Sequence, residues 1–248
     1  RSRKNIDGEL FVLNYGKCAA IAFDKVKKKP LYHFHPDEEV LSIGTIGCNF
    51  NCKFCQNWEL SQTEYETVDV TPERIVELAQ QKGIGIAYTY TEPLMWYEFV
   101  YDTAKLAKEK GLKNILITNG FIEVEPLKGL LEYIDAANVD LKAFSNEFYM
   151  KLCGKLGPIK RAIRLFNEKC HLELTTVIIP GENDSLEEME EMVNWIAGLN
   201  PNIPLHIGRY YPSYRLDKPP TPIETLERLR KIANKKLSYV YINNVKGE

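Results

Sequence analysis

The chain has 248 residues, 44% of them hydrophobic and 27% charged, and its formal net charge is −2. A chain of this composition buries a sizeable core, and its charge argues against a nucleic-acid-binding surface that covers the whole protein. The sequence contains no apolar stretch long enough to cross a bilayer.

The cysteines point to a reducing compartment. Six cysteines, three of them within residues 48–55, do not resemble the disulfide framework of a secreted protein. The first residues also lack the charged and then apolar pattern of a secretory signal. We therefore expect a cytoplasmic location, with no membrane partner and no nucleic-acid partner.

The first predicted elements lie in residues 8–34, which have the pattern of antiparallel strands. We interpret residues 1–38 as an N-terminal β appendage and residues 39–248 as a single domain. Six β-branched runs follow, and each precedes an amphipathic stretch without a Pro/Gly/Ser-rich linker. Repeated β-then-α units predict an α/β fold, here a partial (β/α)6 TIM-like barrel. The predicted strands are 40–46, 85–90, 114–119, 137–144, 172–179 and 204–211.

Helix starts are marked by capping patterns. Thr71 is a predicted N-cap followed by Pro72, and Ser185 with Glu188, like Thr221 with Glu224, has the spacing of a capping box. A stripe at helical period in 185–199 predicts a face packed against the core. Its residues are Leu186, Met189, Val193, Ile196 and Leu199.

Polar residues follow the predicted strands at their carboxyl ends, where barrels of this kind carry their chemistry. Burying such groups without partners would cost roughly 1–3 kcal/mol each, so we expect them to converge on a cleft. Besides the cysteine loop after the first strand, they are Thr91, Glu92, Thr118, Asn119, Asp140, Lys142, Thr175, Thr176, His206, Arg209 and Tyr210.

The loop GCNFNCKFCQNW contains Cys48, Cys52 and Cys55 in a C-x3-C-x2-C pattern. A structural zinc site needs a fourth ligand, and no Cys or His lies between Cys55 and Cys153. A disulfide with a free thiol does not suit a reducing compartment. The third interpretation is an iron–sulfur cluster held by three thiolates, with one iron open to another ligand.

This pattern, with Phe54 just before the last cysteine, resembles the signature of the radical S-adenosylmethionine (SAM) superfamily. The resemblance implies a [4Fe–4S] cluster on Cys48, Cys52 and Cys55, whose open iron binds the amino and carboxylate groups of SAM. It also implies reductive cleavage of SAM, usually to methionine and a 5′-deoxyadenosyl radical that abstracts hydrogen from a substrate. An electron donor such as flavodoxin or ferredoxin is then required.

Two further segments resemble family motifs. TYTEP (89–93) stands where the family usually has Gly-Gly-Glu-Pro, which makes Glu92 the expected acceptor for the SAM ammonium, with Thr91 beside it. Glu92 is alternatively an N-cap for the next helix. ITNG (117–120) resembles the Asp-Thr-Asn-Gly of glycyl-radical-activating enzymes, which implies cofactor contacts for Thr118 and Asn119. Ile117 replaces the acid of that motif.

The later strand ends resemble the same group. NVDLKAF resembles its Asp-Leu-Lys segment, so Asp140 is expected to contact the ribose or methionine of SAM, beside Lys142. A core salt bridge is the alternative for this pair, because both residues lie on one face of the strand. TTVIIPG resembles the fifth-strand Val-Pro-Gly turn, with Thr175 where an arginine is expected. Cofactor contacts are therefore also predicted for Thr176, His206 and Arg209.

A narrower resemblance covers nearly the whole chain. The segments RKNIDGEL, KKPLYHFHP, SIGTIGCNFNCKFCQNWELSQ, ITNGF and YVYINNVKG resemble the AmmeMemoRadiSam-system radical enzymes, often labelled pyruvate formate-lyase-activating-enzyme homologues. Members of this group commonly have cysteine motifs just outside the first and last of these segments. We expect such cysteine-rich ends to be missing from the sequence given.

The expected function is thus radical SAM chemistry, with hydrogen abstracted from a glycyl residue of a partner protein or from another peptide or small molecule. One alternative is a zinc-binding interaction module without turnover. Another is a radical SAM enzyme that cleaves a different carbon–sulfur bond of SAM.

Overall fold

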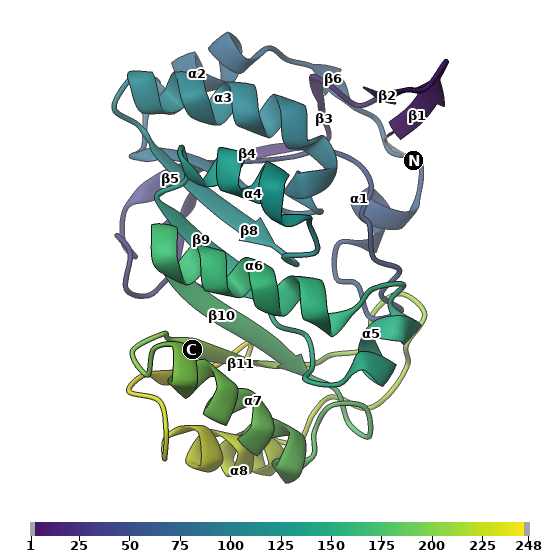
Figure 1. The fold of residues 1–248 in the computed structure, drawn as a ribbon, viewed down its shortest axis with the longest axis vertical. Coiled ribbons are helices and arrows are strands. Elements are labelled where there is room, and N and C mark those ends of the chain that lie inside the picture. Colours follow the sequence, from purple (N-terminus) through teal and green to yellow (C-terminus); the bar gives the residue numbers. More distant parts are fainter. Residues whose placement is uncertain (1–2, 246–248) are drawn as a thin grey trace.

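The computed structural model describes residues 3–245. Its main body is one sheet of eight strands, in the order β12-β11-β10-β9-β8-β7-β5-β4, with helices packed against it (Figure 1). The strands are β4 (Ala20–Lys25), β5 (Glu39–Gly44), β7 (Gly85–Tyr88), β8 (Lys113–Thr118), β9 (Ala136–Asp140), β10 (His171–Ile178), β11 (Leu205–Arg209) and β12 (Val240–Asn243).

The six predicted strands are present, and each pairs in parallel with the next along the chain. Two further strands extend the sheet. At one edge β4 pairs antiparallel with β5, and at the other β12 pairs in parallel with β11. The predicted α/β fold with a mostly parallel sheet is therefore confirmed. β12 belongs to the segment YVYINNVKG, whose Lys246 and Gly247 lie outside the described residues.

Helices connect the parallel strands and lie on one face of the sheet, as Figure 1 shows for α2, α3, α4 and α6. Helix α1 and the 3-10 helices η1 and η2 are short. The bounds are η1 (Val26–Lys28), α1 (Trp58–Gln62), α2 (Pro72–Gln81), η2 (Pro93–Trp96), α3 (Tyr97–Glu109), α4 (Val124–Leu131), α5 (Asn146–Lys151), α6 (Leu156–Lys169), α7 (Leu186–Leu199) and α8 (Ile223–Ala233).

Two of the three predicted caps are confirmed. The hydroxyl of Thr71 accepts a hydrogen bond from the Arg74 amide, and that of Ser185 accepts one from the Glu188 amide. The prediction for Thr221 is wrong, because α8 begins after Pro222. The Thr221 hydroxyl instead donates to the carbonyl of Ile178 at 2.5 Å, which ties the loop before α8 to the end of β10.

The predicted apolar stripe of α7 is correct at its centre and wrong at its start. Met189, Val193 and Ile196 are buried, together with Met192, which the prediction omitted. Leu186 is 41% exposed because it occupies the first turn, which extends beyond the edge of the core.

The N-terminal segment is antiparallel, as predicted, but it is not all separate from the sheet. β1 (Arg3–Ile6) and β2 (Glu9–Val12) form a hairpin, and β3 (Lys17–Cys18) pairs with β6 (Val68–Asp69). β4 is part of the main sheet. The division at residue 38 stays a prediction.

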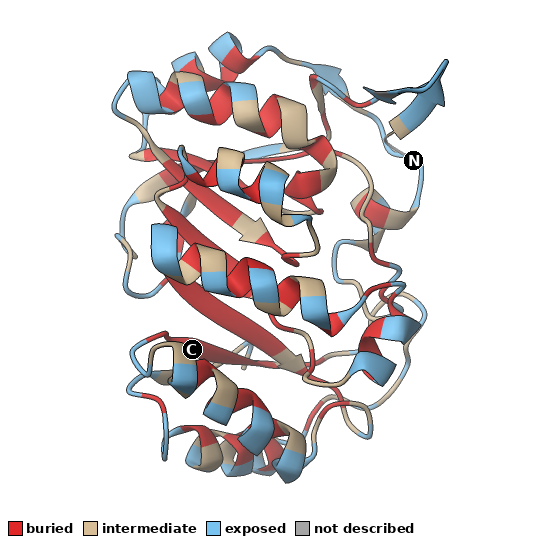
Figure 2. Cartoon of the chain, viewed as in Figure 1, coloured by how far each residue is buried: buried red, intermediate tan, exposed pale blue. Residues whose placement is uncertain are grey.

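Side chains pack against both faces of the sheet. The larger cluster fills the space between strands and helices, and the buried strands and inward helix faces are visible in Figure 2. A second cluster lies on the other face, here called the inner face. Val26 and Leu31, from the segment between β4 and β5, pack there against Val40, Ala87 and Ile115. This segment covers the inner face near the strand starts, which leaves the carboxyl ends for a site.

Candidate functional site

The cysteine loop leaves the carboxyl end of β5 and leads into α1. In Figure 1 the arrowheads of β8 and β10 point toward the side on which α1 and α5 lie. Gly47 adopts φ 89°, which favours glycine, and its amide donates to the Leu60 carbonyl at 2.9 Å. The Asn51 amide donates to Leu152 after α5 at 3.1 Å. The loop is therefore fixed at both sides by backbone hydrogen bonds.

The three thiols are largely enclosed and have hydrogen-bonding neighbours. Cys52 is only 7% exposed, whereas Cys48 and Cys55 are half-buried. The Cys48 sulfur accepts from the Phe50 amide at 3.4 Å, and the Cys55 sulfur lies 3.2 Å from the Ser61 hydroxyl. Donors directed at sulfur are one of the features that tune iron–sulfur clusters.

Burial keeps the thiols of Cys48 and Cys52 protonated when no metal is bound. Burial, with a smaller effect from Glu92, raises the pKa of Cys48 to about 12, and burial raises the pKa of Cys52 to about 11. A thiolate in this environment needs a strong positive charge beside it, which a coordinated metal supplies.

All six cysteines are free in the described part of the chain. The prediction that Cys48, Cys52 and Cys55 bind metal remains a prediction, because no group of three or more His, Cys, Asp or Glu side chains within residues 3–245 stands close enough to hold an ion. The donor set nevertheless fits an iron–sulfur cluster: three soft sulfur ligands on one loop. Binding would require the cysteine side chains to turn toward one another.

Glu92 is the most tightly held acid of the site. It is 2% exposed, and its carboxylate accepts from the Thr118 hydroxyl at 2.7 Å, the Asn119 amide at 2.8 Å and the Leu94 amide at 3.0 Å. Burial raises its pKa to about 7, although the three donors act in the opposite direction. The contact with Leu94 is an N-cap of η2, so the capping interpretation holds alongside the proximity to Cys48.

The end of β8 joins Glu92 to the cysteine loop. The side-chain amide of Asn119 donates to the side-chain oxygen Oδ1 of Asn49 at 2.7 Å and lies 3.8 Å from the Cys48 sulfur. Asn49 in turn donates to the Phe121 carbonyl at 3.0 Å. Thr118 and Asn119 thus both contact Glu92, and Asn119 also lies beside Cys48.

Asp140 and Lys142 form an ion pair of 2.9 Å between Oδ2 and Nζ at the end of β9. Burial disfavours the charged lysine, but the Asp140 carboxylate outweighs it and holds the pKa of Lys142 above its ordinary value. The electrostatic influence of Lys142 also reaches the thiol of Cys52. The pair is therefore both the salt bridge of the alternative interpretation and a neighbour of the cysteine loop.

Two further predicted residues lie around the loop. The Thr91 hydroxyl donates to the Thr45 carbonyl at 2.8 Å, which places it beside the start of the loop. Tyr90, in the position of a family glycine, adopts φ 68°, a left-handed conformation that favours glycine. Phe54 is half-buried, packs near Phe148 with ring centroids 6.1 Å apart, and lines a groove of about 490 Å³.

Thr176 lies away from the predicted cleft. Thr175 donates to the Asn138 side chain at 2.8 Å on the inner face, and alternation along β10 turns Thr176 to the helix-covered face. Its hydroxyl is buried there without a hydrogen-bond partner. Two adjacent identical residues carry no signal about which of them faces the inner side, so the sequence could not place Thr176.

His206 is also placed differently from the prediction, whereas Arg209 lies at the predicted end of its strand. His206 is fully buried near the start of β11, where its Nε2 lies 2.6 Å from Glu173 Oε2 and its Nδ1 lies 2.9 Å from Asn243. Arg209 is at the correct end of β11, but its Nε donates to the Thr221 carbonyl at 2.8 Å. The prediction counted His206 among the residues at the carboxyl end of its strand, although it is the second residue of β11.

Several polar residues of the site were not predicted. Asn49 lies within the cysteine loop, Ser61 and Gln62 contact the loop, and Asn183 donates to the carbonyls of Lys142 and Val177 at 2.7 and 2.9 Å. Ser61 and Gln62 belong to ELSQ, a segment that carried a family resemblance, so that signal could have found them.

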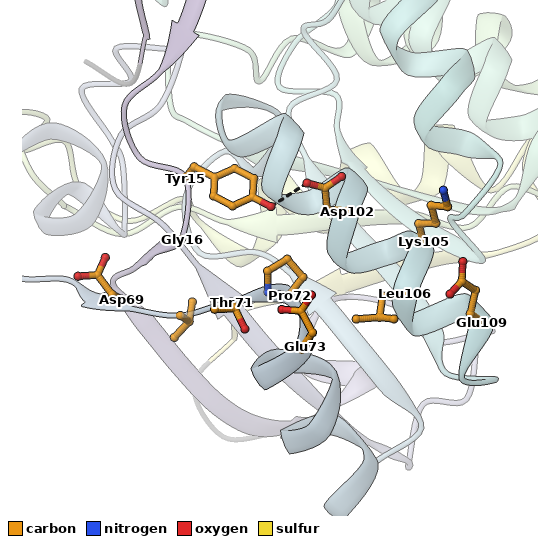
Figure 3. A pocket seen from close by; sticks show the side chains of 11 residues that line it. Tyr15, Gly16, Asp69, Thr71, Pro72, Glu73, Asp102, Lys105, Leu106 and Glu109 are labelled. Atoms are coloured by element: carbon orange, nitrogen blue, oxygen red, sulfur yellow. Dashed lines mark hydrogen bonds between the residues drawn. The ribbon is translucent and has the colours of Figure 1, made fainter.

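A separate groove of about 600 Å³ lies between β6, α2 and α3 (Figure 3). Its lining includes Asp69, Glu73 and Glu109, and the Tyr15 hydroxyl donates to Asp102 at 2.7 Å. The predicted site residues do not line it, so it is distinct from the cysteine loop.

Among residues 3–245, no helix combines the length and the apolar character needed to cross a membrane.

Comparisons with known proteins identify relatives of this chain. The chain is 44% identical over 255 residues to the uncharacterized protein MJ0808 of Methanocaldococcus jannaschii. This alignment covers 99% of this chain and 76% of that protein. It is 27% identical over 209 residues to the pyruvate formate-lyase 1-activating enzyme of Escherichia coli, covering 75% of this chain and 85% of the enzyme.

The fold is also shared with a solved structure. Streptococcus suis SuiB bound to S-adenosylmethionine superposes with a TM-score of 0.65 at 16% identity, over 82% of this chain and 49% of SuiB. The sheet is thus of the partial-barrel type that was predicted. Residues 42–196, which span the cysteine loop, Glu92 and the Asp140–Lys142 pair, match the family described as the Radical SAM superfamily. The chain belongs to the radical SAM superfamily and is a relative of the pyruvate formate-lyase-activating enzymes.

Proposed function

We propose that Cys48, Cys52 and Cys55 hold a [4Fe–4S] cluster and that the protein cleaves SAM reductively to abstract hydrogen from a substrate. The observation that carries this proposal is the convergence of two of the thiols with Glu92 and the Asp140–Lys142 pair at one edge of the sheet. When bound, the cluster would supply the electron that breaks a carbon–sulfur bond of SAM.

Glu92 is suited to receive the SAM ammonium. A carboxylate has about four acceptor positions, and Oε1 already accepts from Leu94 and Thr118. Within residues 3–245, Oε2 accepts a hydrogen bond only from the Asn119 backbone amide, which leaves room for a further donor. A hydrogen bond between a buried carboxylate and a cation is stronger than the same bond at an exposed carboxylate, because the local dielectric constant is lower.

Asp140 and Lys142 provide one acceptor and one cation beside the cysteine loop. Asp140 would accept a hydrogen bond from a hydroxyl of the ribose or contact the methionine part of SAM. Lys142 balances its charge, and the carbonyl of Lys142 is fixed by Asn183 at 2.7 Å. Thr118 and Asn119 hold Glu92 in place rather than touching the reacting bond.

Anaerobic reconstitution tests the cofactor assignment. We expect about four irons per chain and release of 5′-deoxyadenosine after reduction with dithionite in the presence of SAM. Cys55→Ala should lose iron and activity, whereas the matched variant Cys170→Ala, in a cysteine at the end of α6, should retain both. If methylthioadenosine forms instead, a different carbon–sulfur bond of SAM is cleaved from the one proposed. A protein that binds one zinc ion tightly and shows no turnover would contradict the proposal.

For the substrate we propose a glycyl residue of a partner protein, with flavodoxin or ferredoxin as electron donor. The support is the 27% identity to a pyruvate formate-lyase-activating enzyme over 75% of this chain. The segments from RKNIDGEL to YVYINNVKG support a narrower placement in the AmmeMemoRadiSam-system group. Proteins captured from the source organism should include one that acquires a glycyl radical, seen by electron paramagnetic resonance, with SAM and reduced enzyme. Deoxyadenosine release coupled instead to a small molecule would contradict the glycyl assignment.

A further inference from the structure

A buried hydroxyl stands against one of the three cysteine sulfurs, and the inference drawn from it rests on the proposed function. Ser61 is 8% exposed, and its Oγ lies 3.2 Å from the sulfur of Cys55. Either atom could donate in this contact when both carry a proton. A metal-bound Cys55 is a thiolate without a proton, so Ser61 must then be the donor.

Gln62 leaves the proton of Ser61 available for the sulfur. The Gln62 Nε2 lies 3.1 Å from the backbone carbonyl of Phe50, which only accepts hydrogen bonds. This contact assigns the orientation of the side-chain amide. The same nitrogen lies 3.4 Å from Ser61 Oγ, so Gln62 donates to the serine oxygen. Ser61 therefore accepts from Gln62 and directs its own proton to Cys55.

The backbone holds Ser61 in this position. Its amide donates to the Asn57 carbonyl at 3.0 Å within the first turn of α1. The preceding carbonyl, of Leu60, accepts from Gly47 at the start of the cysteine loop at 2.9 Å. The carbonyl of Cys55 is fixed by the Ser213 hydroxyl at 2.9 Å. The backbone of Ser61 and the backbone of Cys55 are thus held on both sides of the contact, which leaves the Cys55 side chain free to turn toward a cluster.

We propose that Ser61 is a positioning residue that orients the Cys55 thiolate and raises the reduction potential of the cluster. A hydrogen bond to a ligating sulfur withdraws negative charge from the metal, which favours the reduced state. Donation from Gln62 polarises the hydroxyl and strengthens this effect. Removing the hydroxyl makes the cluster harder to reduce without removing a ligand.

Redox titration of reconstituted protein, followed by electron paramagnetic resonance, tests the proposal. Ser61→Ala should keep the iron content of the wild type and show a more negative midpoint potential. Ser61→Thr, which retains the hydroxyl, should restore the potential. Thr63→Ala is the matched control, because it removes a hydroxyl that donates to the Glu59 carbonyl on the same helix. Its potential should equal that of the wild type.

Gln62→Leu provides a second measurement if Ser61→Ala does not retain a full cluster. This variant leaves the hydroxyl in place but removes the amide that polarises it, so we expect its midpoint potential to lie between those of the wild type and Ser61→Ala. If Ser61→Ala cannot be titrated, the midpoint potential of Gln62→Leu should still be more negative than that of the wild type. A wild-type potential in the loaded Ser61 and Gln62 variants would overturn the role of Ser61 alone. Wild-type protein that binds no cluster would overturn the proposed function as well, and iron content separates the two results.

Discussion

At the scale of single residues, the site depends on buried polar groups that satisfy one another. Glu92 is enclosed among apolar neighbours, and its carboxylate is held by hydrogen bonds from η2 and from the end of β8. The motif TYTEP predicts an acid here, and the tertiary structure adds the partners. Asn119 carries the connection onward to the cysteine loop through Asn49.

Replacing this acid should damage both stability and cofactor binding. In Glu92→Gln the amide nitrogen of glutamine would face donors that need an acceptor, so we expect a loss of about 1–3 kcal/mol in the free energy of unfolding. Binding of SAM to the reconstituted protein should also weaken. Urea unfolding and calorimetric titration with SAM measure the two effects.

Glu123→Gln is the matched control for this change, because Glu123 is exposed and makes no side-chain cap bond to α4. It should leave the free energy of unfolding and the SAM affinity unchanged. Equal effects of the two substitutions would mean that the contacts of Glu92 contribute nothing specific.

At the scale of elements, the cysteine loop obtains its shape from packing against α5. The loop contains little regular secondary structure, so its conformation depends on contacts with neighbouring segments. One such contact is the hydrogen bond from the Asn51 amide to the Leu152 carbonyl at the end of α5. The ring of Phe50 lies directly against Gly154, which is the third residue after the end of α5. A glycine at this position permits the close approach of the loop.

A methyl group at position 154 should therefore disturb the loop. A Cβ on Gly154 would lie 2.5 Å from the Phe50 ring, which is buried and cannot move freely. We expect Gly154→Ala to lower the free energy of unfolding by about 1–3 kcal/mol through overpacking. Cluster loading, measured as iron per chain, should fall in parallel.

Gly198→Ala serves as the comparison, because a Cβ at that position of α7 meets no atom within 4 Å. Alanine in a helix avoids the entropy cost of glycine, so this variant should be equally stable or gain roughly 0.5–1 kcal/mol. If Gly154→Ala were as stable and as fully loaded as Gly198→Ala, close packing of the loop on α5 would not matter for the site.

At the scale of the whole molecule, Glu173 joins segments from both ends of the chain. Its carboxylate accepts from the His33 amide at 2.8 Å, and His171 and His206 lie at 3.0 and 2.6 Å. His33 comes from the segment that covers the inner face, and β12 reaches the cluster through Asn243. The group closes the inner face at the strand starts, opposite the cysteine loop.

Glu173 should give the protein a characteristic acid sensitivity. Burial would raise its pKa, but the hydrogen bonds from His171, His206 and the backbone dominate and lower it from 4.5 to about 2. A lowered pKa stabilises the fold at pH values above 4.5, and this contribution of about 3 kcal/mol is lost as the pH falls toward 2.

Urea unfolding of wild type and Glu173→Gln at a series of pH values measures this contribution. The difference in free energy of unfolding between the two proteins should shrink as the pH falls from 4.5. The exposed Glu187→Gln should show a constant difference from wild type. A difference for Glu173→Gln that does not change with pH would contradict the assignment.

The sequence by itself determined the repeating strand–helix order and the parallel sheet, and it predicted metal binding by the cysteine loop, because hydrophobic period and ligand spacing are local properties of the chain. It also located Glu92, Thr118, Asn119 and the Asp140–Lys142 pair at strand ends. Only the tertiary structure decided which side chains face one another: that Thr175 and not Thr176 lies on the inner face, and that His206 belongs to the cluster of Glu173. It alone placed Ser61 against Cys55, because such contacts depend on strand alternation, strand boundaries and the packing of segments distant in sequence.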